Sequence, residues 1–96
     1  MWPGLPADSG LDLLGHEILA EKAAALGRAG AKAEASLQRL RENKDDEASR
    51  QSLLKAASEA VHAYFIQREL CGLRRHDSVI RELAIPRAIL VRLGAR

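Results

Sequence analysis

The chain has 96 residues and a net charge of +2, a size that suits a single domain. Its apolar residues are mostly Ala and Leu, and its only aromatic residues are Trp2, Tyr64 and Phe65. Alanine removes little apolar area from water, so a lone copy would have a small core. We therefore expect a homo-oligomer, with a dimer as the first choice. Cys71 is the only cysteine, which excludes an internal disulfide and a disulfide-stabilised secreted scaffold.

The amino-terminal sequence Met-Trp-Pro-Gly-Leu-Pro lacks the basic and apolar regions of a secretory signal. No stretch approaches the ~20 apolar residues that a membrane-spanning helix needs. We expect a cytoplasmic protein with no membrane partner. Residues 1–8 hold two of the three prolines and are predicted to form a flexible tail, whereas residues 9–96 are predicted to form one helical domain.

The first predicted helix covers residues 9–42, where apolar residues recur at steps of three or four. Asp8 or Ser9 would cap its start. Gly27 and Gly30 interrupt a run of alanines in its middle, and each costs roughly 1 kcal/mol relative to Ala in a helix interior. Because small residues let another backbone come close, we expect a continuous helix that crosses another helix here, with a kink as the competing interpretation.

The second predicted helix covers residues 46–71 and follows the polar turn Asn-Lys-Asp-Asp. Asp45 or Asp46 would cap its start, and Gly72 would end it. A short turn between two long helices makes them antiparallel neighbours.

Two short helices are predicted to follow. Asp77 would cap the first, over residues 77–83, and Pro86 suits the first position of the second, over residues 86–93, because its missing N–H is no loss there. No segment alternates apolar and polar residues as a strand does. The predicted fold is therefore all-α: a long antiparallel helical hairpin followed by two short carboxyl-terminal helices.

Charge is unevenly distributed along the chain. Residues 68–96 carry seven Arg against three acidic residues, a net charge of +4, and the first 67 residues have a net charge of −2. A basic end of this kind attracts phosphates or acidic protein surfaces, although a solvated helix face also explains it.

The sequence HAYFIQRELCGLRRHDSVIRELAIPRAILVRLG, residues 62–94, resembles a family of small uncharacterised bacterial helical proteins that share a domain of unknown function. The resemblance implies a bacterial, intracellular, helical protein and implies no activity, cofactor or binding residue.

Residues 79–93, VIRELAIPRAILVRL, are also similar to a helix-turn-helix DNA-binding unit. In that interpretation Pro86 and Arg87 open the recognition helix, and Arg92 faces the major groove. The turn has Ala84 where the motif prefers Gly, and Ile80 stands where it prefers a small residue. A pair of helices folded onto the hairpin or onto a second subunit is the competing interpretation. The candidate nucleic-acid contacts are Arg87, Arg92, Arg75 and Arg81.

No catalytic, metal or cofactor site is predicted. His16, His62 and His76 are far apart in sequence and match no metal-binding spacing. Cys71 with His76 is the only neighbouring nucleophile and base, and Cys71 shares a helix face with apolar residues.

We therefore expect a non-enzymatic protein for helical interaction or oligomerisation, with nucleic-acid binding through residues 79–93 as the alternative. No small-molecule ligand is predicted. The candidate oligomer interface consists of apolar or small residues on the two long helices: Leu26, Ala29, Gly30, Ala33, Leu37, Leu54, Val61 and Phe65.

Overall fold

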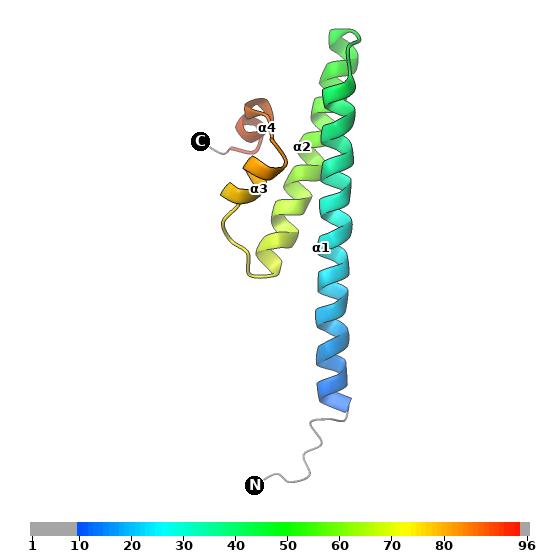
Figure 1. Ribbon diagram of the computed structural model, residues 1–96, viewed down its shortest axis with the longest axis vertical. Coiled ribbons are helices and arrows are strands. Elements are labelled where there is room, and N and C mark those ends of the chain that lie inside the picture. Colours follow the sequence, from blue (N-terminus) through cyan, green and yellow to red (C-terminus); the bar gives the residue numbers. More distant parts are fainter. Residues whose placement is uncertain (1–9, 95–96) are drawn as a thin grey trace.

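The computed structural model describes residues 10–94, and within this range it contains four helices and no strand. In chain order these are α1 (Gly10–Glu42), α2 (Glu47–Leu70), α3 (Asp77–Glu82) and α4 (Arg87–Arg92). Helices α1 and α2 form an antiparallel hairpin, and α3 and α4 lie beside α2 on the side away from α1 (Figure 1). The predicted all-α hairpin with two short carboxyl-terminal helices is confirmed. The predicted tail over residues 1–8 and the cap at Asp8 or Ser9 lie outside the described residues.

The core of the hairpin is built from small and medium-sized apolar side chains. Because these residues recur with the helical period, each helix turns one apolar stripe toward the other. The buried residues of this stripe are Ala33, Leu37 and Leu40 on α1, and Leu54, Ala57, Ala60 and Val61 on α2.

Helix α1 is continuous through Gly27 and Gly30, so no kink occurs there. The two glycines have different surroundings. A Cβ atom on Gly30 would lie 3.2 Å from a ring carbon of Tyr64, whereas a Cβ on Gly27 would meet nothing within 4 Å. Gly30 therefore lets the Tyr64 ring of α2 lie directly on the backbone of α1.

The turn between α1 and α2 is closed by side chains. Asp46 is the amino-terminal cap of α2, and its carboxylate accepts a hydrogen bond of 2.8 Å from the backbone N–H of Ser49. That bond favours the ionised form and so lowers the pKa of Asp46 below its ordinary value of 3.8. Asn43 accepts a 3.2 Å bond from the backbone N–H of Asp45.

Helices α2 and α3 end in the same way. After α2, Gly72 has a φ of 88°, and the backbone N–H groups of Gly72 and Leu73 bond back to the carbonyls of Glu69 and Arg68. This is the Schellman arrangement, in which a left-handed residue turns the chain out of the helix.

Ala84 takes the place of glycine at the end of α3. Its φ is 50°, and the N–H groups of Ala84 and Ile85 bond to the carbonyls of Arg81 and Ile80. The left-handed conformation costs an alanine about 1 kcal/mol relative to glycine.

The two short helices and the turn between them complete the core through Val79, Ile85 and Ile89, which are buried. Two local predictions differ from the structure. Asp77 is the first helical residue rather than the cap of α3, since His76 precedes it at the cap position. Pro86 has extended backbone and precedes α4 as its cap residue rather than forming its first turn.

Replacing Gly27 by Ala tests this account of α1. We expect Gly27→Ala to raise the free energy of unfolding by about 1 kcal/mol, because it restores helix propensity at a site with open space. Gly30→Ala is the matched control and should gain much less, because its methyl group presses on Tyr64. Urea unfolding followed by circular dichroism measures both changes, and equal gains would contradict the assigned role of Gly30.

Candidate interaction surface

The amino-terminal part of α1 extends beyond the end of α2. Helix α2 ends at Leu70, and the Sγ of the next residue, Cys71, lies 4.0 Å from the carbonyl oxygen of Lys22 on α1. Residues 10–21 of α1, here called the overhang, therefore have no part of α2 beside them (Figure 1). The sequence contained a signal for this feature, since the predicted first helix was clearly longer than the second.

The side of α1 that packs on α2 continues into the overhang. Five turns of an α-helix take up about 18 residues, so residues that far apart point in the same direction. Gly15 lies on the same side of α1 as the buried Ala33. Ile18 and Leu19 correspond in the same way to the buried Ser36 and Leu37.

The overhang face, defined as Gly15, Ile18 and Leu19, lacks a partner within the described residues. Ile18 is 49% exposed and Leu19 is 66% exposed, whereas Leu37 at the equivalent position is 1% exposed. A large apolar side chain left in water forfeits about 1.5–3 kcal/mol relative to a buried one. The face is therefore suited to receive another helix.

Four of the eight residues of the predicted oligomer interface are buried within one chain. Ala33, Leu37, Leu54 and Val61 are buried between α1 and α2. The other four predicted residues, Leu26, Ala29, Gly30 and Phe65, are half-buried. Of these four, Gly30 contacts Tyr64 of α2, and Phe65 stacks on His76.

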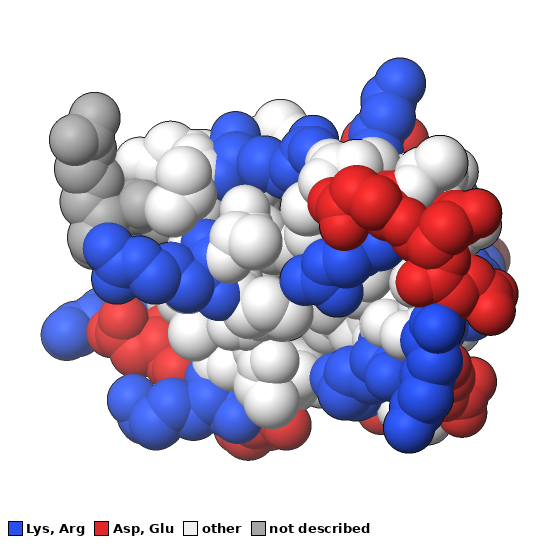
Figure 2. Space-filling model, turned by 90° about the horizontal axis from the view of Figure 1, so that it is seen from above, with Lys and Arg blue, Asp and Glu red and all other residues white. Residues whose placement is uncertain are grey.

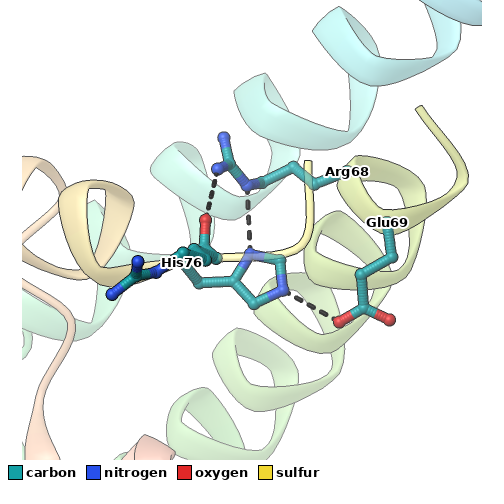
Figure 3. Close-up of polar contacts among 4 residues, drawn as sticks. Arg68, Glu69 and His76 are labelled. Atoms are coloured by element: carbon teal, nitrogen blue, oxygen red, sulfur yellow. Dashed lines mark hydrogen bonds and ion pairs between the residues drawn. The ribbon is translucent and has the colours of Figure 1, made fainter. Parts of the chain in front are cut away.

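A polar network pins the carboxyl-terminal helices to α2 (Figure 3). The Nε–H of Arg68 donates to Nδ1 of His76 over 3.1 Å, and Nη2 of Arg68 donates to the carbonyl of Arg75 over 2.8 Å. Because Nδ1 accepts, the ring proton is on Nε2, which donates to Glu69 over 2.9 Å. The imidazole also stacks on Phe65, with ring centroids 4.1 Å apart.

His76 therefore has a structural task that its position in the sequence did not reveal. Its side chain is only 13% exposed. Its partners come from α2, seven and eight residues earlier in the chain, across a bend. An Arg-Glu pair followed by a histidine at that spacing is too common a pattern to identify such a network.

An open hollow of about 550 Å³ lies beside this network. Phe65, Ile66, Ile80 and Leu93 supply apolar lining, and charged residues such as Arg74 and Arg75 line it as well. Ile66, Leu70 and Leu73 leave further apolar surface exposed nearby.

The four candidate nucleic-acid contacts, Arg87, Arg92, Arg75 and Arg81, all lie at the surface. Arg92 donates to Gln51 of α2 over 3.2 Å, and Arg75 lies 3.6 Å from the carboxylate of Asp77. Seen from above, acidic side chains gather over the hairpin, and the side that carries α4 shows more basic than acidic atoms (Figure 2).

Residues 10–94 contain no group of three side chains able to hold a metal ion. His16 and His62 are exposed and belong to different helices, and Cys71 is half-buried. No helix in this range is long and apolar enough to cross a membrane.

Residues 4–96 match the sequence model of a family of unknown function, DUF6665. The chain belongs to this family. The match covers the overhang, the hairpin and both short helices, so the family includes the whole described fold. Comparisons with curated proteins and with solved structures find no match.

Replacing His76 by Phe tests the network. His76→Phe keeps a ring to stack on Phe65 and removes the bonds to Arg68 and Glu69. We expect a loss of about 1–2 kcal/mol in the free energy of unfolding, because Arg68 is left with an unpaired, partly buried donor. His62→Phe, an equal change at an exposed position of α2, should alter stability by less than about 0.5 kcal/mol. Similar losses in both variants, measured by urea unfolding, would refute the pinning role.

Proposed function

We propose that the protein is a non-enzymatic interaction module that self-associates through the overhang of α1. The observation that carries this proposal is the overhang face: the face of α1 that binds α2 continues through Gly15, Ile18 and Leu19 with nothing packed on it among the described residues. Apolar surface of this kind on a helix is suited to a helical partner.

The small core of a single copy supports the same proposal. The largest fully buried side chains are Leu37, Ile89 and Val61, and three of the other seven buried apolar residues are alanines. Burial of Ile18 and Leu19 against another chain would add apolar area of the kind that the hairpin lacks. Association would therefore stabilise the fold of each copy in addition to joining the copies.

A charged residue on the overhang face tests this proposal. Ile18→Glu should convert the oligomer to a monomer, because it places an unpaired carboxylate in the interface. Leu13→Glu is the matched control: it adds the same charge to the same part of α1 at a position 60% exposed and equivalent to exposed Ala31, so it should associate as the original protein does. Light scattering on a sizing column measures the mass. If wild type is a monomer at every concentration, or if both variants behave alike, self-association through this face is refuted.

We propose nucleic-acid binding as a second candidate function, supported by the outer surface of α4. Arg87, Ala88 and Arg92 are exposed and Val91 is 60% exposed, while Ile89 is buried beneath them. A recognition helix needs such an open outer face. The left-handed Ala84 lies in the turn position where helix-turn-helix units prefer glycine.

A salt titration with random-sequence duplex DNA tests this second candidate. Phosphate contacts release counterions, so binding measured by fluorescence anisotropy should weaken steeply as salt rises. Arg87→Ala should weaken binding several-fold. Arg50→Ala removes the same charge from an exposed position on α2 and should have a smaller effect. Absence of binding at low salt, or equal losses in the two variants, would rule out a DNA contact through α4.

A further inference from the structure

No other helix of residues 10–94 lies beside Ile18 and Leu19 (Figure 1). We propose that the overhang of a second copy packs on them, antiparallel to the first and related to it by a two-fold axis near Gly15. This inference rests on the proposed self-association and adds the segment, the direction and the register of the partner.

The α1–α2 interface continues directly into the overhang face. A helix placed on Gly15, Ile18 and Leu19 would lie on the same face of α1 as α2 does, beyond the point where α2 ends (Figure 1). The overhang of a second copy is a helix with the same apolar face. Two identical faces that cover each other form a closed two-fold pair and leave neither face open.

The end of α2 sets the register. Cys71 lies against Lys22, so an incoming helix meets the end of α2 there and cannot advance further along α1. The end of α2 limits both copies in the same way, so the two helices can overlap only over residues 10–21, a length of roughly 18 Å. The middle of this range is near Gly15, which would face its own counterpart across the axis. No atom outside its own helix backbone and its chain neighbours lies within 4 Å of a Cβ placed on Gly15, so there is room for close approach.

The charges favour the antiparallel direction. In a parallel pair the two Asp12 carboxylates, which border the overhang face, would lie at the same height and repel each other. In the antiparallel pair, Asp12 at the leading end of one overhang comes close to the bend after the partner's α2, which carries Arg74 and Arg75. Glu21 is paired with Arg28 of its own chain over 2.9 Å.

The contact area sets the strength of the dimer. Two overhangs of about 12 residues bury less than the roughly 1,200–2,000 Å² of a standard interface, so we expect dissociation in the micromolar range. Because each substitution acts twice in a two-fold pair, Ile18→Ala should weaken dimerisation by about 100-fold.

A distance between spin labels separates this arrangement from other oligomers. The label is attached at Ala35→Cys, an exposed position away from the α1–α2 interface, in a Cys71→Ser background. The antiparallel pair places the two labels roughly 60 Å apart, and a parallel pair places them within about 35 Å. A short distance in a stable oligomer overturns this inference and leaves the proposed function intact, whereas a monomer up to about 1 mM overturns both.

Disulfide formation at the two-fold axis gives an independent readout. In the same background, Gly15→Cys should form a covalent dimer under mild oxidation, and Glu17→Cys, two residues away and equivalent to exposed Ala35, should not. Equal cross-linking of the two variants, or a failure of Gly15→Cys to cross-link in a sample shown to be dimeric, overturns the placement of the axis.

Discussion

The packing of α1 on α2 is the interaction on which the other features depend. Both helices contribute a stripe of alanines and medium-sized apolar residues, and Tyr64 lies on the backbone at Gly30. Small residues bring the helix axes close, and close axes exclude water from a core that contains few large side chains. Since α2 is shorter than α1, the same stripe that closes the hairpin also continues beyond it. The overhang face is thus a direct extension of the face that forms the core.

The carboxyl-terminal helices depend on the hairpin for their position. Each is only six residues long, too short to be stable alone. Buried Val79, Ile85 and Ile89 attach them by apolar contact, and the bonds of Arg68 to His76 and Arg75 fix the preceding bend. Because these contacts attach α3 and α4 to α2, the hairpin determines where the exposed surface of α4 lies.

Periodicity in the sequence predicted the four helices and their order, because helical spacing and capping residues are local signals. The cap at Asp46 and the helix end at Gly72 were predictable for the same reason. Which part of the apolar face of α1 is covered by α2 was not predictable in this way. Ala33 and Leu37 carry the same pattern as Gly15 and Leu19, and only the end of α2 near Lys22 decides which of them are covered. Likewise, the network around His76 depends on how a bend folds back, which spacing alone does not encode.

Ala84 has a consequence for how the molecule opens. The left-handed backbone of Ala84 is strained because this residue carries a methyl group. We therefore expect local unfolding to begin at the turn between α3 and α4. Fluctuations should therefore begin at the carboxyl-terminal end and leave the hairpin closed, so that amide protons in α4 exchange with solvent long before those around Val61.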